Sequence, residues 1–115
     1  MSEMITALKM EYREHAEAHG KATLSGDYKA ANRSHDKLVA LVPKIRAYGY
    51  AGETALLELT DDTDDAVGCW AATHTLRFNE PRALATLEKL SKKSGPIGFN
   101  AKMVIQQWVK GELKV

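Results

Sequence analysis

Three side chains that could bind a metal recur at intervals of four residues near the start of the chain: Glu11, His15 and His19. On a helix they share one face, and two imidazoles at this spacing can chelate Zn²⁺. Structural zinc needs further ligands, usually cysteines, and the chain has the single cysteine Cys69. The alternative is a polar contact between helices, in which His35 approaches His19. We therefore predict no bound metal and no other cofactor.

Cys69 and His74 are the residues closest to a nucleophile and its base. They are five positions apart, so they point to different faces of a helix, and no carboxylate stands at helical spacing from His74. A free, buried cysteine is the more common state of this residue. The chain is therefore predicted not to be an enzyme.

The segment from position 47 to 75 contains six carboxylates and no lysine or arginine. Four of the six lie in the sequence TDDTDD at positions 60–65, between two apolar stretches. The rest of the chain has an excess of basic residues, because the total is 16 Lys+Arg against 15 Asp+Glu. Separated charge of this kind favours docking to a basic partner. The acids are Glu53, Glu58, Asp61, Asp62, Asp64 and Asp65.

Helix capping explains part of this acidic turn. Asp64 or Asp65 at the next helix N-terminus would stabilise it by roughly 0.5–2 kcal/mol. Glu58, Asp61 and Asp62 are left without such a role, and we expect them to be unpaired and available to a partner. A calcium loop is disfavoured, because the spacing lacks the central glycine and the closing glutamate.

Trp70 and His74 lie one turn apart on the helix that follows the acids. A tryptophan can anchor a protein interface, but the alanines beside Trp70 favour packing in the core. His74 is expected to be a packed, hydrogen-bonded residue. The predicted partner-binding set is Glu58, Asp61, Asp62, Asp64, Asp65, Trp70 and His74.

Helices are expected almost everywhere, since Ala, Leu, Lys and Glu recur and Gly and Pro are sparse. The first should span about 2–24. The second starts after Asp27, and Pro43 should kink it or start a new helix. Its apolar seam is Tyr28, Ala31, His35, Leu38, Val42 and Ile45.

The second half of the chain repeats a helical pair. Leu59 corresponds to Leu87, 28 residues on, and Ala72 and Leu76 correspond to Ala101 and Ile105, each 29 residues on. Helices over about 66–78 and 99–110 end the two pairs. A period near 30 is typical of stacked α-solenoid units. We predict one all-α domain, a short HEAT/armadillo-like solenoid of five to six helices, with residues 1–50 as an N-terminal cap and 51–115 as two pairs.

The segment DAVGCWAATHTL at 65–76 resembles the second helix of a HEAT repeat, except at Gly68, where arginine is usual. Further segments of the chain occur in order: HGKAT, GDYKAANRSHDKL, YGYAGETALLELTDD, LEKLSKKSGPIGFNAKM and QWVKG. With them, nearly the whole chain resembles a small bacterial family described as a domain of unknown function. That resemblance implies a HEAT/armadillo-like fold. It also implies an association with toxin-immunity systems.

These observations predict a non-catalytic protein-binding module. The narrower hypothesis is a bacterial immunity protein whose acidic surface neutralises a toxin of nuclease type. The alternative, a nucleic-acid-binding HEAT-like scaffold, is disfavoured by the pI of 7.9 and the lack of aromatic-interleaved basic motifs. No apolar run approaches the roughly 20 residues of a membrane span. With one cysteine and no apolar leader, a cytoplasmic location is expected.

Overall fold

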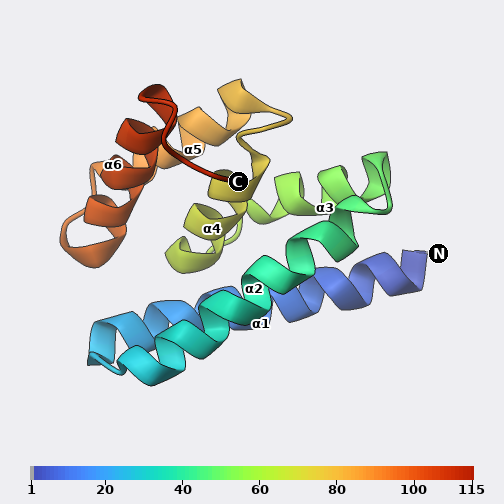
Figure 1. Cartoon of the computed structure of the whole chain (residues 1–115), viewed down its shortest axis with the longest axis horizontal. Coiled ribbons are helices and arrows are strands. Elements are labelled where there is room, and N and C mark those ends of the chain that lie inside the picture. The colour runs from blue at the N-terminus through green and yellow to red at the C-terminus, as the bar shows by residue number, and fades with distance from the viewer. Residues whose placement is uncertain (1) are drawn as a thin grey trace.

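The computed structural model describes residues 2–115, and within them it contains six helices and no strand (Figure 1). The prediction of an all-α fold is confirmed. The helices are α1 (Ser2–Ser25), α2 (Tyr28–Arg46), α3 (Tyr50–Leu59), α4 (Asp65–Thr75), α5 (Glu80–Ser91) and α6 (Gly95–Val109).

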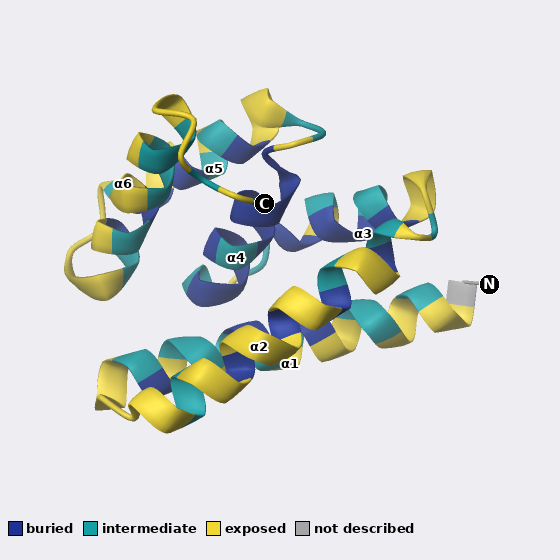
Figure 2. Ribbon diagram, viewed as in Figure 1, coloured by how far each residue is buried: buried dark blue, intermediate teal, exposed yellow. Residues whose placement is uncertain are grey.

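Consecutive helices pack in pairs, α1 with α2, α3 with α4 and α5 with α6 (Figure 1). Helix α4 is the central element, because it also contacts α1, α5 and α6. Nine of its eleven residues are buried, and α4 is accordingly almost entirely dark blue in Figure 2. A helix rich in alanine and glycine can take this place, since small side chains let several neighbours approach closely.

Two clusters of buried side chains form the core, one on each side of α4. The first joins α1–α4 and includes Tyr12, Leu38, Ile45, Leu56 and Val67. The second joins α4–α6 and includes Cys69, Leu76, Leu87, Leu90 and Ala101. Because α4 contributes to both clusters, side chains along α4 are held against both halves of the molecule.

The residues aligned by the repeat occupy matching buried positions in two of the three predicted correspondences. Leu59 and Leu87 are both buried, and so are Ala72 and Ala101. Leu76 is buried as well, but its counterpart Ile105 is only half-buried.

Helix α2 departs from the expectation in two ways. It continues through Pro43 to Arg46, so a new helix start at Pro43 is wrong. Proline has a helix-compatible φ, so the helix can continue, although the missing N–H leaves the carbonyl of Val39 without its helical donor and the ring crowds the preceding turn. Tyr28 is 80% exposed, so the buried seam begins later than predicted. The buried residues of α2 are Ser34, Leu38, Leu41 and Ile45.

The helices expected at 66–78 and 99–110 are displaced towards the N-terminus. Helix α4 ends at Thr75, and α6 begins at Gly95 with Pro96 in its first turn. Proline is favoured at this place, because its missing N–H would have no partner within the helix. Asp64 precedes α4 and accepts a hydrogen bond from the Val67 amide at 3.1 Å, so the predicted cap is confirmed.

Candidate functional site

Three of the four acids of the 60–65 turn, and the neighbouring Glu58 on α3, form ion pairs within the molecule. Basic side chains from α1, α5 and the turn before α6 reach them, and the expectation that they are unpaired is wrong. The ion pairs are Lys9–Glu58 (3.0 Å), Arg13–Asp62 (2.8 Å), Arg82–Asp61 (2.5 Å) and Lys93–Asp65 (2.6 Å). The charge segregation along the sequence is therefore largely cancelled in space.

Asp62 is the least exposed of these carboxylates, with 13% of its side chain accessible. Arg13 donates to both of its oxygens, at 2.8 and 3.2 Å, and the Asp64 amide donates at 2.9 Å. Burial alone would raise the pKa of Asp62. The hydrogen bonds and the charges of Arg13 and Lys9 outweigh burial, so the pKa of Asp62 is lowered.

Gly68 occupies a position with little room for a side chain. A Cβ there would lie 3.3 Å from the carbonyl oxygen of Thr60 and 4.0 Å from a methyl group of Leu90. A side chain at this position would therefore be crowded by the backbone of the preceding turn. The nearby acids obtain their cationic partners from other helices.

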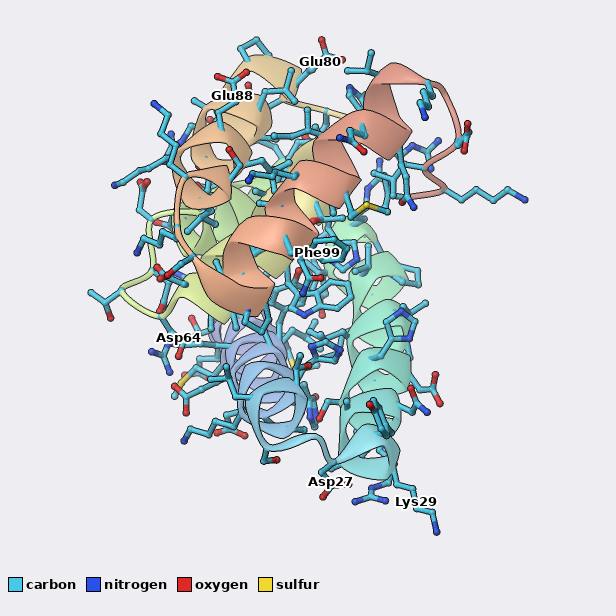
Figure 3. The ribbon with its side chains drawn as sticks, turned by 90° about the vertical axis from the view of Figure 1, so that its left-hand side faces the viewer. Asp27, Lys29, Asp64, Glu80, Glu88 and Phe99 are labelled. Carbon is cyan, nitrogen blue, oxygen red and sulfur yellow. The ribbon has the colours of Figure 1, made fainter. Side chains whose placement is uncertain are left out.

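A pocket of about 630 Å³ lies between the α1/α2 pair and helices α4 and α6. This volume is within the ordinary range of ligand sites. In Figure 3, α6 lies in front of α4 in the upper half of the view, with Phe99 near the middle of the molecule and Asp64 at its left edge between the upper helices and the α1/α2 pair. The apolar part of the wall is formed by Leu24, Val39, Ile97, Met103, Val104 and Leu113.

Trp70 is the centre of an aromatic cluster on this wall. Its ring contacts three imidazoles, with centroid distances of 5.1 Å to His19, 5.5 Å to His35 and 5.6 Å to His74. The four residues come from α1, α2 and α4 and all line the pocket. Three of the four histidines of the chain therefore meet at one tryptophan.

A hydrogen bond from Trp70 defines which ring nitrogen of His19 carries the proton. The indole Nε1–H of Trp70 can only donate, and it lies 3.3 Å from Nδ1 of His19, so the His19 proton is on Nε2. Burial lowers the pKa of His19, and the nearby His35 adds to this effect. The missing side chain of Gly20 lets α1 approach α4 closely, and this brings the neighbouring His19 to Trp70. A Cβ on Gly20 would lie only 2.5 Å from the Cβ of Ala66 on α4.

His74 is held by the fully buried Tyr12, whose hydroxyl lies 2.6 Å from Nδ1. Within residues 2–115 this hydroxyl has no other acceptor, so it donates to Nδ1 and the imidazole proton is on Nε2. Burial, together with the charge of His35, lowers the pKa of His74 to about 4. Burial likewise raises the pKa of Tyr12 well above its usual value, so both groups are neutral near pH 7.

The pocket does not combine these groups into a nucleophile or a metal site. Burial, and then the charge of Asp65, raise the pKa of Cys69 to about 11, so its sulfur stays protonated. In the part of the chain that the structure describes, no group of three or more His, Cys, Asp or Glu could hold a metal ion. His19 faces Trp70, and His15 is not part of the pocket wall.

The predicted binding residues divide into two groups. Asp64, Asp65, Trp70 and His74 line the pocket, whereas Glu58, Asp61 and Asp62 do not line it and are held in ion pairs. Sequence reasoning did not assign Tyr12, His19 and His35 to a binding site. The available signal was the possible approach of His35 to His19, but nothing in the sequence placed Trp70 between them.

Comparison with known proteins informs the fold and leaves the activity open. No protein-family profile matches the chain, and no curated protein matches it significantly. The structure is similar to the crystal structure of the protein RPA1889 from Rhodopseudomonas palustris CGA009, with a TM-score of 0.86 and 22% identity over 96% of this chain and 93% of that one. This likeness supports the helical architecture. None of the described helices has the length and apolar character needed to cross a bilayer.

Proposed function

We propose that this protein is a non-catalytic protein-binding module and that the pocket around Trp70, rather than the acidic turn, is its binding site. The observation that carries the proposal is the convergence of Trp70 with His19, His35 and His74 on the wall of a large pocket. A large aromatic side chain in a concave site is a common anchor of a protein interface.

The rim of the pocket supports a protein partner. Leu24, Val39 and Met103 line it, and each is among the large apolar side chains that are exposed. Exposed apolar groups gathered around a concave site mark interaction surfaces rather than ordinary solvent-facing positions. We infer that an apolar segment of a partner lies along this rim and places a side chain or a chain end against Trp70.

The proposal is tested by selecting peptides from a displayed library against the wild-type protein and measuring the affinity of synthetic copies. Val39→Glu places a charge on the rim and should weaken binding at least about tenfold, the effect of more than 1.4 kcal/mol. Met10→Glu is the matched control, because Met10 is exposed on α1 and outside the pocket. Equal affinities in the two variants would remove the pocket from the function.

Two narrower hypotheses remain predictions. One is that the protein is a bacterial immunity protein, and the other is that its helices form a HEAT/armadillo-like solenoid, as in the family that the sequence resembles. Three successive helix pairs and the matching buried positions 28 and 29 residues apart support the solenoid. Glu58 and Asp61 support an acidic docking surface, since their side chains are 60% and 71% exposed despite their ion pairs.

An exchange of charges tests the acidic surface without losing an ion pair. Reversing Asp61, Asp62 and Asp65 to lysine would also break contacts within the molecule, so lower toxin affinity alone would be ambiguous. Asp61→Arg combined with Arg82→Asp keeps the pair and relocates the negative charge. Docking through Asp61 requires that this variant lose affinity for a nuclease-type toxin while its Tm stays near the wild-type value.

A further inference from the structure

The hydrogen bond between Trp70 and His19 requires a neutral imidazole. Nε1–H of Trp70 can only donate, so Nδ1 of His19, 3.3 Å away, must offer a lone pair. A protonated imidazole carries a hydrogen on both ring nitrogens, so turning the ring does not restore an acceptor. Protonation of His19 therefore removes this contact between α1 and α4.

The orientation of the two rings gives a charged His19 no compensating attraction to Trp70. The N–H edge of the indole faces His19, and the ring planes are at 90° to each other. The edge of an aromatic ring is the positive part of its quadrupole, whereas a cation is attracted to the face. A positive charge on His19 is therefore repelled by the same group that holds the neutral ring.

The surrounding groups do not neutralise a cation at His19. The charged and titratable side chains that line the pocket come from α1, α2, α4 and the chain after α6: Glu17, Lys21, His35, Asp64, Asp65, Cys69, His74 and Lys114. Within residues 2–115 no carboxylate lies within ion-pair distance of the His19 ring, since Asp64 caps α4 and Asp65 pairs with Lys93. Helix α6 contributes uncharged side chains to this wall. The charge of His35 opposes the protonation of His19 further.

From the proposed function, on which this step rests, we infer that the pocket is an acid-sensitive binding site and that His19 is the residue that switches it. At neutral pH, His19 fixes the indole of Trp70 in the wall between α1 and α4, and the pocket accepts the apolar segment of a partner. In mild acid His19 takes up a proton, Trp70 loses its acceptor and the wall gains a positive charge. An apolar partner then binds more weakly, because only the neutral form of His19 is competent to bind it.

The first test follows the hydrogen bond itself, in the wild-type protein and without a partner. NMR spectra record the indole Nε1–H and histidine Cε1–H signals from about pH 7.5 to about pH 5. We expect Nε1–H of Trp70 to shift with the same midpoint as Cε1–H of His19. Trp108 is an internal control, because its Nε1–H donates to Glu80 at 2.7 Å rather than to a histidine. An unmoved Trp70 signal would overturn the switch, and so would a parallel loss of helical circular dichroism, which marks unfolding.

Matched variants identify the titrating residue. His19→Asn removes the titration but keeps a side-chain acceptor, so Nε1–H of Trp70 should no longer respond to pH. His15→Asn is the control, because His15 lies on the same helix and outside the pocket, and it should leave the response of Trp70 in place. A wild-type response of Trp70 in His19→Asn would assign the effect to another histidine and overturn the role of His19.

Affinity measurements separate this inference from the proposed function. End-capped peptides without titratable side chains, selected at about pH 7.5, should bind the wild type at least about threefold more weakly at about pH 5. His19→Asn should bind them equally at both pH values. Equal affinities of the wild type would overturn the regulation and leave the pocket as a binding site. Equal binding by Val39→Glu and Met10→Glu would overturn the pocket and its regulation together, although the Trp70 signal would still report the hydrogen bond.

Discussion

Tyr12 and His74 form the most buried polar contact of the site, and each satisfies the other. The hydroxyl donates to Nδ1 at 2.6 Å in a region closed to water. The contact fixes the imidazole proton on Nε2 of a histidine that lines the pocket. At the residue scale, the chemistry of the site is set by a side chain 62 positions away along the chain.

Tyr12→Phe removes the donor and leaves the buried Nδ1 of His74 without a partner. We expect the free energy of unfolding to fall by about 1–3 kcal/mol, measured by urea denaturation. Tyr50→Phe is the control, since Tyr50 is exposed and should change stability by less than about 0.5 kcal/mol. Equal effects would mean that the hydrogen bond contributes nothing specific.

The lowered pKa of His74 predicts a loss of stability in mild acid. The unfolded chain takes up a proton near pH 6.5, whereas the folded protein does so only near pH 4, so protonation favours unfolding between these values. The contribution is greatest above pH 6.5 and is lost as the pH falls towards 4. Between pH 7 and pH 5 the loss should be about 2 kcal/mol. Urea titrations of His74→Gln should show a shallower pH dependence, and an unchanged slope would contradict the assignment.

Helices α1 and α4 approach unusually closely at Gly20 and Ala66. The absence of a side chain on Gly20 permits this contact, which brings His19 to Trp70. At the scale of the elements, the pocket exists because one glycine lets a long N-terminal helix lie against the central helix. The same glycine lowers the intrinsic helix stability of α1.

Gly20→Ala should destabilise the protein by about 1–3 kcal/mol through overpacking, although alanine is the better helix former. Adding Ala66→Gly restores the space, so the double variant should be more stable than the sum of the two single effects predicts. The measurement is a double-mutant cycle by thermal or urea unfolding. Additive effects would show that the two helices adjust freely at this point.

The acidic turn joins all three helix pairs when the molecule is considered as a whole. Its ion pairs reach α1 through Arg13 and α5 through Arg82. Beside the turn, Glu58 at the end of α3 pairs with Lys9 of α1. The 60–65 turn therefore supports the packing of the pairs in addition to connecting α3 to α4. Most of its pairs are exposed, and exposed pairs contribute little individually.

Asp62 should be the exception among these acids. Asp62→Asn weakens two charge-assisted hydrogen bonds from Arg13 in a largely buried setting, and should cost about 1–2 kcal/mol. Asp61→Asn, at an exposed pair, should cost less than about 0.5 kcal/mol. Chemical denaturation of both variants at the same ionic strength checks this, and equal losses would contradict the role given to burial.

The sequence by itself determined the helical class, the capping by Asp64 and the buried positions Leu59, Leu87, Ala72 and Ala101. These follow from interactions within about one turn of helix, or from an apolar period that repeats along the chain. The sequence left open whether Pro43 kinks α2 or starts a new helix, and the helix continues because the packing around it outweighs the loss of one backbone hydrogen bond.

Only the tertiary structure decided which charges remain free and where the binding pocket lies. The acids are clustered in sequence, but their partners Arg13, Arg82 and Lys93 come from distant positions, and no local pattern encodes such pairing. In the same way, Tyr12, His19 and His35 reach α4 only when α1 and α2 pack against it. The pairing of charges and the burial of side chains depend on distances in space. Those distances are set by how the helices pack and cannot be read from the order of residues along the chain.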